Sequence, residues 1–271
     1  MSNNLVFLNL VLLKGTAEEK LHAAHKAGFD QVEIWLEDIE NSTEGVEKLK
    51  NFSKIHRLGF TNIQVLRDFT GIPEVERLNK RQEFYKFIDL AQKLGCNTIQ
   101  APATTREDCI PERINDDLCW LASEAARYKM RIMYEPMAWC SIDNTLPLAW
   151  KRIQKLEQPN IGLVVDLFHI CALGGDSSQL DGIPADYIYE VQLCDIAKPL
   201  PIRDKSKLIN IARHQRLLPG EGIINIKEFI DKLHSINYRG PIGLEVFNDK
   251  FKNLPPYEAA VKAWHSIKKY L

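Results

Sequence analysis

Four side chains with oxygen donors close short apolar stretches in the second half of the chain. They are Glu135 in IMYEP, Asp166 in GLVVD, Gln192 in YEVQL and Glu245 in GLEVF. If these stretches are neighbouring parallel strands of a barrel, their carboxyl ends meet at one face and the four side chains converge there. Three bare carboxylates in one place repel one another strongly unless a divalent cation neutralises them. We therefore predict a metal site formed by these four residues.

The donor atoms also indicate the kind of ion. Carboxylate and amide oxygens are hard ligands, so we expect Mn²⁺ or Mg²⁺, with Co²⁺ as an alternative. The absence of a clear histidine or cysteine ligand argues against a dedicated zinc site. A strand-end carboxylate taken alone has a simpler explanation, a cap on the next helix, but four on consecutive strands favour metal binding.

Proton transfer requires a titratable group beside these ligands. His169 lies one helical turn after Asp166, and histidine is the side chain whose ordinary pKa lies nearest to neutrality. We predict that His169 acts as a general acid or base, and that Glu135 takes part in catalysis as well as in metal binding. The alternative for His169 is a structural imidazole with fixed hydrogen bonds.

Arg67 follows the third expected strand and is the first candidate for substrate binding. A guanidinium in that place can hold a substrate carboxylate through two parallel hydrogen bonds. The alternative is an ion pair of Arg67 with Asp68 or Glu33.

Residues 196–224 form an unusually long predicted loop between the seventh strand and its helix. Loops of this length in barrels are usually lids or substrate walls. Its basic residues His214, Arg213 and Arg216 are predicted to close over an anionic substrate, and a solvated basic loop is the alternative.

A repeating unit predicts the elements that position these residues. In KAGFDQVEI (26–34), RLGFTNIQV (57–65) and KLGCNTIQA (93–101), a helix ends near a glycine and a β-branched strand follows. Each glycine stands where a left-handed helix cap is expected. The period of about thirty residues is typical of alternating helices and strands.

Later units complete eight strands, with helices expected at about 112–128 and 146–156. Eight units in about 250 residues predict an α/β fold, a single (β/α)8 TIM barrel that spans residues 1–271 as one catalytic domain. The structural alternative is an open doubly wound sheet. That fold normally shows a glycine-rich loop after its first strand, and Leu10 to Gly15 contains one glycine.

Composition excludes several classes of partner. Lys and Arg total 35 against 36 Asp and Glu in 271 residues, so we expect no nucleic acid and no membrane as a partner. The six cysteines show no close pairing, and we interpret them as reduced thiols of a cytoplasmic protein. The apolar run at residues 5–13 lacks the basic start of a signal peptide, and no apolar segment reaches the length of a membrane helix. A homo-oligomer is left open.

The strand-end residues resemble those of the xylose isomerase-like barrels, which include sugar isomerases and epimerases, inosose dehydratase and endonuclease IV. The resemblance covers essentially the whole chain and implies metal ligands at Glu135, Asp166 and Glu245, with Gln192 in place of the usual histidine. A glutamine there is similar to the bacterial 3-dehydroshikimate dehydratases. Five further segments resemble the same group: LRDFTG (66–71), YEPMAW (134–139), DLFHI (166–170), VQLCD (191–195) and ARHQRLLPGEG (212–222).

The resemblance implies a metal-dependent hydro-lyase that converts 3-dehydroshikimate into protocatechuate and water. The alternative is a sugar or sugar phosphate isomerase or epimerase that acts on a ketose or inosose, because both reactions start by removing a proton next to a carbonyl. In either case the partner is a small hydroxylated keto acid or sugar. An endonuclease IV-like nuclease is a remote alternative, since it would need a basic groove and a histidine cluster. A sugar-binding barrel without catalysis is the last hypothesis.

Overall fold

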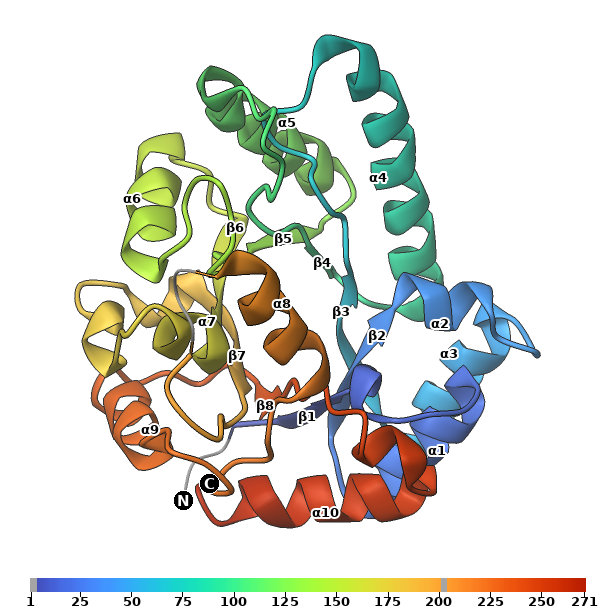
Figure 1. Ribbon diagram of the computed structural model, residues 1–271. Helices are drawn as coiled ribbons and strands as arrows, with labels where there is room; N and C mark the ends of the chain where they lie inside the picture. The colour runs from blue at the N-terminus through green and yellow to red at the C-terminus, as the bar shows by residue number, and fades with distance from the viewer. Residues whose placement is uncertain (1–3, 201–203) are drawn as a thin grey trace.

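The computed structural model describes residues 4–200 and 204–271, in which eight parallel strands close into a barrel (Figure 1). Each strand pairs with the next in the chain, and the last pairs with the first, Leu8 opposite Leu244. This closure confirms the predicted (β/α)8 barrel and excludes the open sheet. The strands are β1 Val6–Asn9, β2 Gln31–Trp35, β3 Gly59–Gln64, β4 Thr98–Gln100, β5 Arg131–Tyr134, β6 Ile161–Asp166, β7 Ile188–Leu193 and β8 Ile242–Leu244.

Helices between the strands form the outer wall of the barrel (Figure 1). Their buried residues recur every three or four positions, so one apolar face of each packs against the strands. The helices predicted at about 112–128 and 146–156 are confirmed. The α-helices are α1 Ala17–Ala27, α2 Leu36–Glu40, α3 Val46–His56, α4 Glu74–Leu94, α5 Ile114–Arg127, α6 Leu146–Leu156, α7 Leu167–Ala172, α8 Lys205–His214, α9 Ile226–Ser235 and α10 Pro256–Lys268. Short 3₁₀ helices lie at Leu10–Leu12, Pro111–Arg113, Ser177–Leu180, Ala185–Tyr187 and Phe251–Asn253.

The repeating unit predicts a left-handed glycine at the end of three helices. Gly28 ends α1 with φ 107° and Gly95 ends α4 with φ 78°, which confirms two of them. The third is wrong, because Arg57 ends α3 with φ 53° and Gly59 is the first residue of β3. Strand β3 starts at Gly59 opposite Gln31 of β2, so the preceding helix has to end two residues earlier.

Two glycines in the strands leave space for large aromatic side chains. A β-carbon on Gly162 would lie 2.4 Å from the ring of Tyr189, and one on Gly243 would lie 2.3 Å from Phe7. Both distances are far below van der Waals contact. These positions therefore require glycine if the barrel interior is to pack at native density around the two rings.

The segment between β7 and α9 was predicted as one long loop, and this is wrong because it contains helix α8. Asp204 caps α8 by accepting a backbone N–H of its first turn. The arm after α8 is tied to the end of β7 by the buried carboxylate of Asp195, which accepts three backbone N–H groups between Gly220 and Ile224. Residues 201–203 of the predicted loop lie outside the described residues.

Two further expectations concern the described residues. In residues 4–200 and 204–271, no helix combines the length and the apolar character needed to cross a membrane. All six cysteines are free thiols, as the sequence predicts.

Candidate active site

A cavity of about 510 Å³ opens where the carboxyl ends of the strands meet, which is the usual place of barrel active sites. Its size suits a small molecule. Residues at the ends of β2, β3 and β4 and just after β5 and β8 line it, and α8 covers one side through Lys205, Ile209, Ala212 and Arg213. The polar residues at its floor are Gln64, Gln100, Glu135, His169, Arg216 and Glu245.

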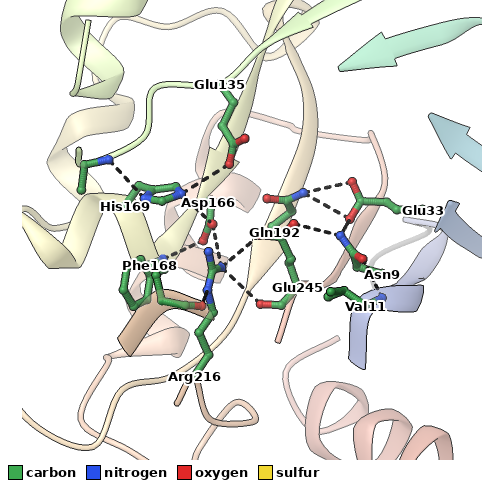
Figure 2. A network of polar contacts seen from close by, with 12 residues as sticks. Asn9, Val11, Glu33, Glu135, Asp166, Phe168, His169, Gln192, Arg216 and Glu245 are labelled. Atoms are coloured by element: carbon green, nitrogen blue, oxygen red, sulfur yellow. Dashed lines mark hydrogen bonds and ion pairs between the residues drawn. The ribbon is translucent and has the colours of Figure 1, made fainter. Parts of the chain in front are cut away.

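The four predicted ligands all lie at this end of the barrel and are almost fully buried (Figure 2). Asp166 ends β6 and Gln192 lies near the end of β7, in register with each other. Glu135 and Glu245 immediately follow β5 and β8. Glu135 and Asp166 approach each other closely enough to share one ion, whereas Glu245 is not part of that group of described acidic and histidine side chains.

Arg216 lies between the carboxylates rather than in a loop over the cavity, which corrects its predicted place (Figure 2). Its Nη1 is 2.8 Å from Asp166 Oδ2 and 3.1 Å from Glu245 Oε2. Its guanidinium also lies 4.5 Å above the ring of Phe168. Burial opposes the charge, but the two carboxylates raise the pKa of Arg216, so it stays a cation.

The floor of the cavity therefore holds more acidic groups than basic ones. Three carboxylates, those of Glu135, Asp166 and Glu245, face one guanidinium, and ionisation of all three leaves two negative charges. Burial and the neighbouring acids raise the pKa of Glu135 well above its ordinary value, and burial raises the pKa of Glu245 to about 8. A divalent cation would balance this charge.

His169 is the third member of the tight group, with Nε2 3.4 Å from Asp166 Oδ2 and 3.6 Å from Glu135 Oε1. Its Nδ1 accepts the backbone N–H of Ala138. Burial lowers the pKa of His169 to about 4, so the ring is neutral and its one proton is on Nε2. In this tautomer the Nε2–H of His169 faces the carboxylates of Glu135 and Asp166, and the ring offers neither a free base nor a metal-binding lone pair there.

The amide of Gln192 is oriented by Glu33, a buried carboxylate of β2. Gln192 Nε2 donates to both oxygens of Glu33, at 3.0 and 3.2 Å. Gln192 Oε1 is buried and has no hydrogen-bond partner among the described residues. A buried amide oxygen without a partner is costly, and a metal ion would satisfy it.

Comparison with known proteins gives the family. The model of the xylose isomerase-like TIM barrel matches residues 21–269. The chain belongs to this family. It is 35% identical over 260 residues to a 3-dehydroshikimate dehydratase of Pseudomonas aeruginosa, which covers 95% of this chain and 40% of the relative. It is 24% identical over 251 residues to an inosose isomerase of Halalkalibacterium halodurans, which covers 88% of this chain and 86% of the relative.

One solved structure is also similar to this chain over nearly its whole length. A xylose isomerase-like TIM barrel/4-hydroxyphenylpyruvate dioxygenase fusion protein superposes with a TM-score of 0.90 at 30% identity, over 97% of this chain and 42% of that chain. This chain spans about 40% of the length of the dehydratase that it matches.

Of the predicted substrate-binding residues, Arg67 lines the cavity and His214 does not. Arg67 lines the cavity, half exposed, and its Nη1 is 3.6 Å from Glu37, so it pairs with neither Asp68 nor Glu33. The described lining of the cavity does not include His214, whose Nδ1 lies 3.0 Å from an exposed Asp249 carboxylate. His214 is thus placed outside the cavity that it was predicted to close.

Sequence reasoning missed several polar residues of the site. Gln100 Nε2 donates to Glu135 Oε2 at 2.7 Å, and Asn9 Nδ2 donates to both Glu33 and Glu245 at 2.9 Å. Asn9 and Gln100 end β1 and β4, so the rule that found the later ligands also applies to them. Glu33 lies inside its strand, and only its charge in an apolar run marks it.

Proposed function

We propose that this chain is a divalent-metal-dependent 3-dehydroshikimate dehydratase, a hydro-lyase that forms protocatechuate and water. The observation that carries this proposal is the charge pattern of the cavity. Its floor has three carboxyl groups around the single guanidinium of Arg216, and the cations Arg67, Lys205 and Arg213 also line it. Such a site suits a cation below and a substrate with a carboxylate above. The similarity to the Pseudomonas aeruginosa dehydratase supports the same reaction.

The residues fit a divalent ion, because the charges balance and Gln192 Oε1 lacks another partner. Glu135, Asp166, Gln192 and Glu245 would hold the ion, and oxygen ligands favour Mn²⁺ or Mg²⁺. When bound, the ion supplies Lewis acidity toward a ketone oxygen.

The reaction removes a proton next to the ketone and a hydroxyl group, which leave together as water. Glu135 accepts the proton from carbon and returns it to the departing hydroxyl. His169 donates its Nε2–H to a substrate oxygen, which changes its predicted role from acid or base to hydrogen-bond donor. Arg67 holds the carboxylate, and Trp139, which packs edge-on against His169 with 4.7 Å between ring centroids, limits the space beside it.

The second candidate is a sugar or inosose isomerase or epimerase. It is favoured by the inosose isomerase relative, because that match covers most of both chains. A neutral sugar would use the same floor but would leave the rim cations without an anionic partner. Under either reaction we propose a cytoplasmic enzyme that acts on a small hydroxylated keto acid or sugar and has no nucleic acid or membrane partner.

One assay tests both candidates. Metal-free protein is reloaded with Mn²⁺ or Mg²⁺ and mixed with 3-dehydroshikimate, and protocatechuate is followed by its absorbance. We expect product only with the ion, and none from the Glu135→Gln variant. A panel of ketoses and inososes is tested in parallel. Turnover of a neutral sugar without any reaction of the keto acid would replace the dehydratase by the isomerase.

A further inference from the structure

The amide of Gln192 poses a problem that carboxylates do not have. Its oxygen can bind a hard cation, whereas its NH₂ group cannot, and the two ends are nearly equal in size. Gln192 is fully buried, so a wrong orientation would turn two N–H donors toward the metal site. Some neighbouring group must therefore select the orientation.

Glu33 is placed to make this selection. Figure 2 shows the Gln192 nitrogen directed toward the two oxygens of Glu33 and the Gln192 oxygen on the other side. Both oxygens of Glu33 accept N–H groups in this arrangement, so Glu33 holds the NH₂ end of Gln192 and offers no donor to its oxygen. Glu190 lies on the same side but is only at the limit of hydrogen bonding, 3.5 Å from Gln192 Nε2.

Glu33 is itself fixed by two neighbouring amide side chains. Asn62 Nδ2 donates to its Oε1 at 2.8 Å, and Asn9 Nδ2 donates to its Oε2 at 2.9 Å. Asn9 cannot turn over, because its Oδ1 accepts the side-chain N–H of Trp35 at 2.8 Å and the backbone N–H of Val11 at 3.0 Å. The same Asn9 nitrogen donates to Glu245 Oε1.

We propose that Glu33 is a positioning residue that converts Gln192 into an oxygen ligand, with Asn9 linking it to Glu245. This inference rests on the proposed metal site. It assigns a role to a buried carboxylate that touches neither the substrate cavity nor the ion. Partners behind metal ligands commonly contribute 10- to 100-fold in affinity, roughly the effect expected here.

The test measures Mn²⁺ affinity on metal-free protein by calorimetry, which does not depend on activity. Glu33→Gln should weaken Mn²⁺ binding by roughly 10- to 100-fold, because one of its ends now donates and favours the reversed Gln192 amide. Asp117→Asn is the control for the loss of a buried carboxylate, since Asp117 accepts from Gly71 and Arg77, away from Glu33 and Gln192. It should change the affinity by less than about threefold, as expected for a distant group.

The exchanged pair separates orientation from damage to the fold. In Glu33→Gln/Gln192→Glu the same hydrogen bond runs in the opposite direction, and both ends of residue 192 are oxygens. This double variant should recover most of the affinity that Glu33→Gln loses, and it remains informative if the single variant does not fold. Wild-type affinity in Glu33→Gln, or no recovery in the exchanged pair, would overturn the positioning role while leaving the metal site intact. Absence of Mn²⁺ binding to the wild type would instead remove the site itself.

Discussion

Arg67 is the side chain that best separates the two candidate activities, because 3-dehydroshikimate carries a carboxylate and a neutral sugar does not. Arg67→Ala should lower kcat/KM for the keto acid by roughly 10- to 100-fold, mainly through KM, as expected for a charge-assisted hydrogen bond. Arg67→Lys should recover part of this, because an ammonium lacks the two-pronged contact. Steady-state kinetics of the wild type, Arg67→Ala and Arg67→Lys measure both changes in kcat/KM.

Glu37 provides the matched control for Arg67. It is the acid that faces the guanidinium at 3.6 Å, and both side chains are half exposed. Glu37→Gln removes the competing partner and leaves the cation, so KM should stay the same or fall. If Arg67→Ala had normal kinetics, or if Glu37→Gln raised KM as much as Arg67→Ala, Arg67 would not be a carboxylate ligand.

The cysteines offer a second prediction at this scale. Burial raises the pKa of Cys171 to about 12 and also raises that of Cys194, so little reactive thiolate forms. In native protein at mildly alkaline pH, a thiol reagent should modify Cys109 and Cys119 before Cys194. Peptide mass spectrometry gives the order, and labelling in denaturant gives the total. Rapid modification of Cys194 in the native state would contradict its burial.

Residue types at strand ends predicted the carboxylates of the floor, because polar side chains close four consecutive apolar runs, whereas one such acid alone is explained by a helix cap. The partners of these residues could not be predicted in the same way. Arg216 belongs to a segment after β7, and its contact with Asp166 spans 50 positions of sequence. The tautomer of His169 depends on the backbone N–H of Ala138, a contact that no sequence pattern marks.

At the scale of the elements, Asp195 determines how the segment after β7 returns to the barrel. It is fully buried and accepts the backbone N–H groups of Gly220, Gly222 and Ile224. Asp195→Asn replaces one accepting oxygen by a donor, so we expect a loss of about 2–3 kcal/mol in the free energy of unfolding. Denaturant titration measures the loss, and limited proteolysis should show earlier cleavage in this segment.

Asp204→Asn is the control in the same segment. Asp204 is exposed and caps α8, and asparagine caps a helix as well as aspartate does. Its unfolding free energy should therefore change by less than about 0.5 kcal/mol. Equal stability of the two variants would mean that Asp195 does not anchor the segment.

Helix α8 shows what element prediction overlooked. Asp204 at its start, and Arg213 and His214 in its last turn, are ordinary signals of a helix. The whole segment between the seventh strand and the next predicted helix was assigned to one loop instead. The start of β3 at Gly59 could not be predicted for a different reason. It is set by pairing with Gln31 of β2, and a local sequence pattern contains no information on strand register.

For the whole molecule, the sequence predicted the closed barrel because helix and strand alternate eight times, and closure then brings distant strand ends together. That same closure concentrates negative charge at one end of the molecule. The chain as a whole has a formal charge of only -1, so the excess of carboxyl groups around Arg216 is a local feature of the fold. Ionising these buried groups beside one another opposes folding when no cation is bound.

This charge leads to a prediction for the stability of the whole protein. Mn²⁺ at about 100 times its dissociation constant should stabilise the native state by about 2.7 kcal/mol, which corresponds to a rise in Tm of roughly 5–10 °C for a protein of this size. A chelator should reverse the rise. Asp166→Asn removes one charge and one ligand but keeps the oxygen that accepts the N–H of Phe168. Its new NH₂ group faces the buried guanidinium of Arg216 in place of the accepting oxygen, so its Tm without metal should be lower than that of the wild type. Mn²⁺ should raise this Tm much less. Calorimetry measures Tm for both proteins. If Mn²⁺ raised the Tm of Asp166→Asn as much as that of the wild type, the ion would bind away from Asp166.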